Sequence, residues 1–242
     1  MQGYLHSIES FSALDGPGIR SVVFLQGCPL RCVYCHNPES WKLENGTLIE
    51  SSEIFKTVGK NLKYIKKNGG ITISGGEPTF QIDFLSDLLK GFKRMGLHTA
   101  VDTSGYVGIE QINKIINDTD LFIVDIKHLD PAKCLGITGK TNESALTLLK
   151  YLEKQSKDTW IRNVLLPGLT DQEEYIKEIC AFVKSLSNVK RFELLPCHNL
   201  AEEKYKKLGI PNKNPYRANF DYLTLQKIQK QYDHFYGEKV II

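Results

Sequence analysis

The chain has 242 residues, of which 41% are hydrophobic and 24% are charged, as in an ordinary globular protein. This composition excludes a disordered chain, a collagen-like chain and a small disulfide scaffold. Thirty-one Lys and Arg against 28 Asp and Glu give a net charge of +3, which does not favour a nucleic-acid partner.

The first 20 residues are predicted to form an N-terminal extension that precedes the repeating part of the fold. They lack the basic-then-apolar order of a signal peptide. Nowhere does the sequence contain the roughly 18 consecutive apolar residues that a membrane span needs. We therefore expect a cytoplasmic protein that binds neither membranes nor nucleic acid.

From residue 21 onward, short β-rich runs alternate with segments of helical period, which is the pattern of βα units around a parallel sheet. Each run is rich in Val, Ile, Leu, Phe or Thr. The six predicted strands are residues 21–26, 71–74, 97–102, 121–126, 160–166 and 191–195.

Between these strands, apolar residues recur at helical spacing and predict the helices that cover the sheet. The periodic segments are residues 54–65, 84–92, 112–116, 141–152 and 176–183, followed by a helix over 222–236 and a strand over 239–242. The lysines at positions 60, 63, 66 and 67 fit an exposed helix face.

No composition shift or flexible linker divides the chain, so we predict one domain over residues 1–242. A complete eight-unit barrel takes about 250 residues, whereas six units and the terminal extras already use up this chain. The predicted fold class is α/β, a partial, open barrel of six βα units. Its open side could admit something larger than a metabolite.

Polar, Gly and Cys residues follow each predicted strand, which is where barrels and open α/β sheets collect their chemistry. The segments are residues 27–38, 75–78, 102–105, 125–128, 162–168 and 196–199. We expect these segments to share one rim of the sheet.

Three of the six cysteines, Cys28, Cys32 and Cys35, follow the spacing C-x3-C-x2-C. Three thiolates in one tight loop can hold three irons of a cubane cluster and leave the fourth iron open to substrate. Structural zinc usually takes paired knuckles, and no second C-x2-C occurs. Residues 32–36 also match the haem-attachment pattern, which leaves Cys28 unexplained. The spacing thus favours an iron–sulfur cluster over zinc or haem.

The cysteine loop resembles that of the radical S-adenosylmethionine (SAM) enzymes. Residues 15–20, DGPGIR, are similar to a signature of the activators of glycyl radical enzymes, and residues 35–38 and 74–78 resemble the same group. The similarity continues through residues 102–103, 125–127, 160–162 and 194–198. No cysteine lies between Cys35 and Cys134, so the ferredoxin-like insert of many such activators is absent. Within the family, this short form favours pyruvate formate-lyase as the partner.

The resemblance implies a [4Fe–4S] cluster on Cys28, Cys32 and Cys35, and SAM that is consumed as a cosubstrate. It also implies a radical SAM oxidoreductase that removes hydrogen from a glycine Cα of a partner glycyl radical enzyme. The electron would come from a donor such as flavodoxin or ferredoxin. Because the chemistry belongs to the cluster and SAM, we predict no acid or base residue.

By the same resemblance, SAM is expected to contact Tyr34, Cys35, His36, Gly76, Asp125, Ile126, Lys127 and His198. The Gly75–Gly76 turn would let backbone come close to SAM, with Glu77 as support. Cys197 stands where a bulkier residue is more common in the family. We expect Cys134, in a loop, and Cys180, on a helix face, to be structural.

Three further groups leave alternatives open. Asp102 and Asp125 end neighbouring strands, and either a monovalent cation that also uses Thr103 or the side chain of Lys127 could neutralise them. Arg162 lies inside a strand and either pairs with an acid or contacts the SAM carboxylate.

Asp15 and Arg20 either bind the partner peptide, or cap a turn and pair with an acid. At the level of function, the alternatives are a radical SAM enzyme that acts on another glycyl radical enzyme or a small molecule, and a metal-binding scaffold without turnover.

Overall fold

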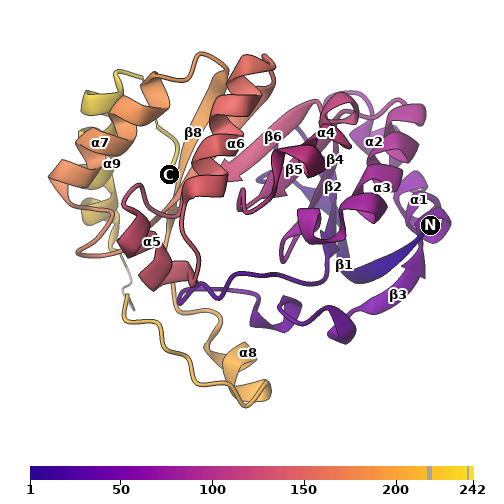
Figure 1. The fold of residues 1–242 in the computed structure, drawn as a ribbon, viewed down its shortest axis with the longest axis horizontal. Coiled ribbons are helices and arrows are strands. Elements are labelled where there is room, and N and C mark those ends of the chain that lie inside the picture. The colour runs from indigo at the N-terminus through magenta and orange to yellow at the C-terminus, as the bar shows by residue number, and fades with distance from the viewer. Residues whose placement is uncertain (217–219, 239) are drawn as a thin grey trace. The chain divides into compact units, whose positions relative to one another are not determined.

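The computed structural model describes residues 1–216, 220–238 and 240–242, which form two compact units (Figure 1). Unit 1 comprises Met1–Pro29 and Glu39–Ile123, and unit 2 comprises Leu30–Pro38 and Val124–Ile242. The chain crosses between the units after Pro29, after Pro38 and after Ile123, the last of these inside a strand, β6 (Leu121–Asp125). The prediction of a single domain stays a prediction.

Unit 1 contains the N-terminal strands of the sheet. They are β1 (Gln2–Ser12), β2 (Arg20–Leu25), β3 (Thr47–Glu50), β4 (Gly70–Gly75), β5 (Thr99–Thr103) and the first part of β6 (Leu121–Asp125). Their order is β3-β1-β2-β4-β5-β6, in which β1 is antiparallel to β2 and β3, whereas β2, β4 and β5 are parallel. β3 is the edge strand on this side, so the sheet ends there and does not close into a barrel.

The helices of unit 1 cover its sheet with apolar faces. They are α1 (Ser51–Gly59), α2 (Leu62–Ile65), α3 (Ile82–Arg94) and α4 (Ile109–Asn113), with short 3₁₀ turns at Pro38–Ser40, Leu43–Asn45, Pro78–Gln81 and Ile116–Asp118. In α3 the residues at helical spacing, Phe84, Leu85, Leu88 and Phe92, are buried. Phe92 meets Phe55 of α1 edge to face, with ring centroids 5.1 Å apart.

Unit 2 contains the end of β6, followed in the sheet by β7 (Asp158–Leu165) and β8 (Val189–Pro196), which are parallel to each other. Its helices are α5 (Pro131–Thr138), α6 (Glu143–Lys154), α7 (Glu173–Lys184), α8 (Glu202–Lys207) and α9 (Tyr222–Tyr236). The helix ends match their sequences. Asp221 caps α9 by accepting from the Thr224 amide at 2.8 Å, and Gly237 ends it with a positive φ of 81°.

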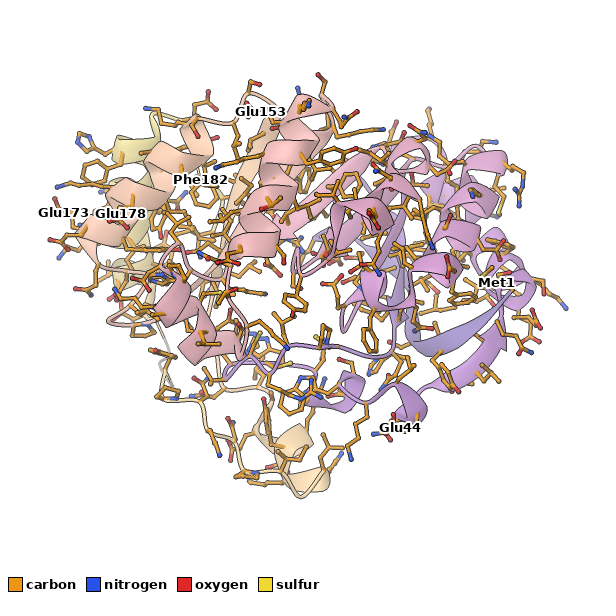
Figure 2. All side chains as sticks on the ribbon, viewed as in Figure 1. Met1, Glu44, Glu153, Glu173, Glu178 and Phe182 are labelled. Atoms are coloured by element: carbon orange, nitrogen blue, oxygen red, sulfur yellow. The ribbon has the colours of Figure 1, made fainter. Side chains whose placement is uncertain are left out.

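Helices α7 and α9 lie side by side in unit 2 (Figure 1). The fully buried Tyr232 of α9 packs against Phe192 of β8 and donates its hydroxyl to the Thr170 carbonyl at 2.9 Å. Figure 2 shows Glu173 and Glu178 on the outer side of α7, and both residues are exposed. Among the described residues, none of the helices is long and apolar enough to cross a membrane.

The six predicted parallel strands and the open sheet are confirmed, and the C-terminal helix has the predicted bounds. Residues 1–20, the predicted N-terminal extension, contain a strand that the sequence did not predict, β1 (Gln2–Ser12). Cys134 lies in α5 and not in a loop. Of the predicted terminal strand, Lys239 lies outside the described residues, and Ile241 forms an isolated parallel bridge to Glu193.

Candidate cofactor site

In unit 1, Cys28 and Gly76 lie against each other at the carboxyl ends of β2 and β4. The Cys28 amide donates to the Trp41 carbonyl at 3.1 Å, and the Gly76 amide donates to the Leu25 carbonyl at 2.9 Å. A Cβ placed on Gly76 would lie 2.4 Å from the Gly27 carbonyl oxygen and 3.0 Å from the Cys28 Cβ. Glycine is therefore required here because two backbones meet beside the first cysteine.

Glu77 is fully buried and joins the turn after β4 to the loop after β5. Its Oε1 accepts from the Thr79 amide at 3.1 Å, the Thr79 hydroxyl at 2.6 Å and the Thr103 hydroxyl at 2.8 Å. Its Oε2 accepts from the amide and hydroxyl of Ser104, at 2.8 and 2.5 Å. Five donors satisfy this carboxylate, so Glu77 fixes the two loops relative to each other. Sequence reasoning named Glu77 and Thr103 but missed Thr79 and Ser104.

Asp102, at the end of β5, lies beside the same turns. Its Oδ2 accepts from the Ser74 hydroxyl of β4 at 2.8 Å. The structure thus brings Cys28, Gly76, Glu77, Asp102 and Thr103 to one end of the unit 1 sheet, as the sequence predicts. Because Asp102 belongs to unit 1 and Asp125 to unit 2, a cation shared by the two stays a prediction.

Asp15 and Arg20 lie at the opposite, amino end of β2. Six residues at about 3.3 Å each put roughly 20 Å of strand between Arg20 and the end that leads to Cys28. The side chain of Arg20 is fully buried, with Nε donating to the Thr72 hydroxyl at 2.7 Å and Nη2 to the Ile71 carbonyl at 2.6 Å. The same Thr72 hydroxyl donates to the Asp15 carbonyl at 2.5 Å. These contacts favour the alternative in which the two residues support the fold, and the partner-peptide role stays a prediction.

In unit 2, the second half of the cysteine loop is attached to the end of α5. The amides of Arg31 and Val33 donate to the carbonyls of Thr138 and Ile137, at 2.8 and 2.9 Å. The loop then turns on itself, because the Cys35 amide donates to the Cys32 carbonyl at 3.0 Å. Cys32 and Cys35 are both partly exposed and can reach a ligand.

Tyr34 carries a buried hydroxyl that lacks a hydrogen-bond partner among the described residues. The side chain is 8% exposed and packs in a cluster with Ile137, Leu166 and Cys197. Burial raises its pKa well above the ordinary value for tyrosine, so the hydroxyl keeps its proton and can donate. A buried, unpaired polar group inside the cysteine loop fits contact with a polar ligand such as SAM.

Asp125 and Lys127, at the end of β6, form a buried ion pair with an N–O distance of 2.7 Å. Burial is the largest single influence and lowers the pKa of Lys127, but Asp125, Tyr34 and Cys32 together outweigh it, and that pKa is raised well above its ordinary value. This pairing favours the alternative in which Lys127 neutralises Asp125. Ile126 between them is held by β7, since its carbonyl accepts from the Asn163 side chain at 2.7 Å. The sequence places Asn163 in the strand-end segment 162–168 but gives it no role of its own.

His36 and His198 stack with ring centroids 3.7 Å apart, and the His36 Nε2 donates to the His198 carbonyl at 3.2 Å. Burial, and then the neighbouring imidazole, lower the pKa of His36, so this imidazole is predominantly neutral at pH 7. Arg162 forms an ion pair with Glu193 at 2.7 Å, and both are almost completely buried. That pairing favours the structural alternative for Arg162.

Within the described ranges, no three or more His, Cys, Asp or Glu side chains are already gathered in metal-binding geometry. Cys28 belongs to unit 1, and Cys32 and Cys35 belong to unit 2. The donor set nevertheless fits the predicted cofactors in kind, because it offers three partly exposed thiols, a buried unpaired hydroxyl and a partly exposed glycine turn.

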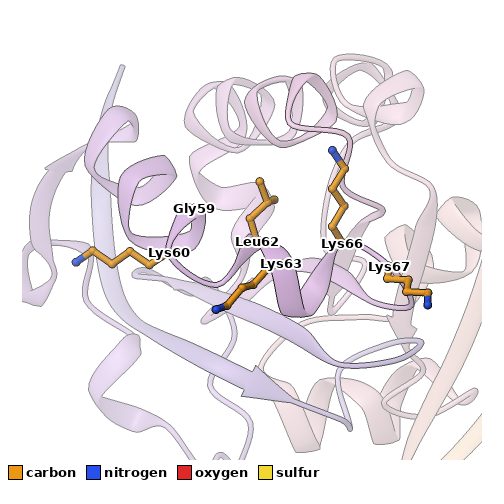
Figure 3. A pocket seen from close by; sticks show the side chains of 6 residues that line it. All are labelled: Gly59, Lys60, Leu62, Lys63, Lys66 and Lys67. Atoms are coloured by element: carbon orange, nitrogen blue, oxygen red, sulfur yellow. The ribbon is translucent and has the colours of Figure 1, made fainter.

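The lysines at positions 60, 63, 66 and 67 lie with Leu62 around a shallow hollow of about 530 Å³ on α1 and α2 (Figure 3). Their ammonium groups point in different directions and do not converge on one point (Figure 3). The hollow therefore lacks the geometry of an anion site. The four lysines are exposed, as predicted, but only Lys63 lies inside a helix, α2, because the predicted continuous helix is broken after Gly59.

Comparison with known proteins places these residues in a family. Residues 22–182 match the radical SAM superfamily. The chain is 43% identical over 217 residues to a pyruvate formate-lyase-activating enzyme of Streptococcus mutans, covering 86% of this chain and 82% of that one. It is 44% identical over 214 residues to the enzyme of the same name from Clostridium pasteurianum, covering 88% and 90%.

Two solved structures are similar to this chain in fold. A domain of pyruvate-formate lyase-activating enzyme from Bacteroides vulgatus superposes with a TM-score of 0.59 at 25% identity, over 72% of this chain and 98% of that one. SuiB of Streptococcus suis, solved with the precursor peptide SuiA, superposes with a TM-score of 0.68 at 16% identity, over 90% and 47%. The second likeness shows the fold alone. This chain belongs to the radical SAM superfamily, whose cofactors are a [4Fe–4S] cluster and SAM, and within it to the family of the pyruvate formate-lyase-activating enzymes.

Proposed function

We propose that this protein activates a glycyl radical enzyme, with pyruvate formate-lyase as the partner and a flavodoxin or ferredoxin as the one-electron donor, in the cytoplasm. The observation that carries the proposal is the C-x3-C-x2-C loop in a chain that is 43–44% identical, over nearly all of its length, to pyruvate formate-lyase-activating enzymes. The ordered strand-end loops around Cys28 and around Cys35 support it.

Cys28, Cys32 and Cys35 are the proposed cluster ligands. The other three cysteines, Cys134, Cys180 and Cys197, are 3% exposed or less, and burial raises the pKa of each of these thiols, that of Cys180 to about 12. Since the thiolate is the form that binds metal, buried thiols with raised pKa values are poor ligands.

SAM is proposed to lie against residues from both halves of the site. In unit 1 these are the Gly76 turn, with Glu77 as its support, and Asp102 with Thr103 as part of a candidate cation site. In unit 2 they are Tyr34, Cys35, His36, Asp125, Ile126, Lys127 and His198. The unpaired hydroxyl of Tyr34 supports the assignment most directly, because a ligand would satisfy it.

A cluster held by Cys28, Cys32 and Cys35 would supply one electron from the donor for the cleavage of SAM to methionine, and the glycine Cα hydrogen atom would end on 5′-deoxyadenosine. The protein's own side chains hold and orient the reactants. Tyr34 keeps its proton and donates, the Asp125–Lys127 pair fixes opposite charges at one strand end, and Glu77 keeps two loops in register.

Single replacements by Ala test the ligand assignment. Loss of Cys28, Cys32 or Cys35 should abolish the iron bound after anaerobic reconstitution, whereas loss of Cys134, Cys180 or Cys197 should leave iron content unchanged. Iron and sulfide analysis is the measurement. Loss of the cluster in any variant of the second group would refute the assignment. A protein that binds the cluster but does not cleave SAM under a strong reductant would be a scaffold and not an enzyme.

A further inference from the structure

A segment far along the chain holds the end of the cysteine loop. We name residues 197–205, which run from the end of β8 into α8, the clasp segment. Residues 34–37, the last part of the cysteine loop, belong to the same compact unit. About 160 positions of sequence separate the two segments, and no motif links them.

Three consecutive residues of the loop each contact the clasp segment, and the residue before them, Tyr34, shares a buried hydrophobic cluster with Cys197. The contacts, in order, are the Cys35 carbonyl accepting from the Tyr205 hydroxyl at 3.2 Å, the His36 ring stacked on His198, and the Asn37 side-chain oxygen accepting from the Lys204 ammonium at 2.6 Å. The contacts use apolar packing, a neutral hydrogen bond, ring stacking and a charged hydrogen bond. Such matched pairing fixes both the path and the register of the loop.

The anchors on the clasp are themselves well fixed. Tyr205 is 3% exposed, and its amide donates to the Ala201 carbonyl at 3.2 Å within the first turn of α8. Cys197 is 2% exposed, and its sulfur accepts from the buried Asn214 side chain at 3.6 Å. A buried tyrosine hydroxyl aimed at a loop carbonyl restrains that carbonyl, because breaking the bond would leave a polar group unpaired.

We propose that the clasp segment positions the third cluster cysteine, with Tyr205 and Lys204 as positioning residues; this rests on the proposed function, in which Cys35 is a cluster ligand. Arg31 and Val33 fix the first part of the loop to α5, and the clasp fixes the part that follows. Cys35 lies between these two attachments. Without the clasp, a loaded cluster would have one loosely held ligand.

The principal variants remove one contact each and preserve side-chain bulk. Tyr205→Phe deletes only the hydroxyl, and Lys204→Met deletes only the ammonium. Lys206→Met is the matched control, because Lys206 lies on the same helix, is largely exposed and pairs with the exposed Glu203. Lys204→Arg tests rescue, since it keeps a cation within reach of Asn37.

The first measurement is the rate of iron release to a chelator from reconstituted protein. We expect Tyr205→Phe and Lys204→Met each to accelerate release roughly 3- to 10-fold, as for the loss of one hydrogen bond, and the Lys206 control and Lys204→Arg to behave as wild type. The EPR spectrum of the reduced cluster with SAM should change in the same two variants. Release rates and spectra like those of wild type in both would overturn the proposal.

The second measurement needs no cluster. In cluster-free protein, alkylation by iodoacetamide is followed by mass spectrometry at Cys35, with Cys28 of the other unit as internal reference. Tyr205→Phe should raise the ratio of Cys35 to Cys28 labelling several-fold, and an unchanged ratio would contradict the clasp. If Tyr205→Phe changes the labelling as expected but the wild-type protein never binds a cluster, the clasp is supported and the proposed function is refuted.

Discussion

Gly76, in the turn after β4, packs directly against the backbone that leads to the first cysteine, Cys28. From the sequence, Gly76 is predicted to let the backbone approach SAM. A larger side chain there would then weaken SAM binding and leave the cluster intact. In the structure the missing Cβ faces the Gly27 carbonyl and the Cys28 Cβ. A substitution here therefore disturbs the cysteine before it disturbs any ligand.

We predict that Gly76→Ala lowers both the iron content after reconstitution and the affinity for SAM, because the new methyl group must displace the backbone at Cys28. Gly136→Ala is the matched control, since no heavy atom lies within 4 Å of its Cβ position and α5 accepts alanine. Iron analysis and SAM binding measure the two effects. A normal iron content together with weakened SAM binding would instead show that Gly76 serves SAM binding alone.

His128 gives the protein a defined dependence on pH. It is 1% exposed, and its Nδ1 accepts from the Asp130 amide at 2.9 Å. Burial, and then the charge of Lys133, lower its pKa to about 4. An unfolded histidine has a pKa near 6.5, so at lower pH the unfolded chain binds more protons, and the native state loses stability as pH falls from 6.5 toward 4.

The free energy of unfolding should therefore fall by roughly 2 kcal/mol between pH 7 and pH 5 through His128 alone. In His128→Asn, whose side-chain oxygen can still accept from the Asp130 amide, this part of the decrease should disappear. Urea unfolding at the two pH values measures it. The same pH dependence in the variant and the wild type would show that His128 does not titrate as its burial implies.

The predicted site residues came from local motifs, and those motifs named the right strand ends. Cys28, Gly76 and Asp125 each lie at the carboxyl end of a predicted strand. What the sequence could not show is how they are held, because the holding residues are distant in the chain and carry no motif. Tyr205 and Asn163 are ordinary residue types in a helix and a strand, and only the folded contacts give them a role.

At the scale of elements, the parallel strands could be predicted because each is a short apolar run next to a helix of regular period. β1 and β3 could not be predicted in this way. β1 has only one fully buried residue, Gly3, so it lacks a periodic apolar face, and its pairing is with strands on both sides. α5 and α8 were also missed, since helices of 8 and 6 residues carry too few turns to show a period.

The loop before β2 depends on Arg20, which ties it to the first residues of β4. We predict that Arg20→Met lowers the free energy of unfolding by roughly 3–5 kcal/mol, because it leaves the Ile71 and Pro17 carbonyls and the Thr72 hydroxyl without their donor. Arg94→Met, an exposed change in α3, is the control. Urea unfolding followed by circular dichroism is the measurement, and a loss below 1 kcal/mol would contradict the structural role.

Asp15 offers a separate test of whether this loop meets the partner. If Asp15→Asn keeps SAM cleavage without partner but lowers the glycyl radical yield, the loop contacts the partner peptide. Equal loss of both would assign Asp15 to the fold, where its side chain accepts from the Ser12 hydroxyl at 2.5 Å.

At the scale of the whole molecule, the proposed cofactor residues come from both compact units. Unit 1 supplies Cys28 and the Gly76 turn, and unit 2 supplies Cys32, Cys35 and the Asp125–Lys127 pair. The cysteine motif itself crosses from one unit to the other after Pro29. A cluster that binds the native state and not the unfolded chain stabilises the native state, so loading should raise the melting temperature of the protein.

The most direct test of the proposed function is anaerobic EPR on a mixture of the reduced, reconstituted protein, SAM and pyruvate formate-lyase. We expect a glycyl radical doublet on pyruvate formate-lyase, with one methionine and one 5′-deoxyadenosine formed for each radical. Omission of SAM, or use of the Cys35→Ala variant, should abolish the signal. SAM cleavage without any radical on pyruvate formate-lyase would contradict the assigned partner, and absence of cleavage would contradict the activity itself.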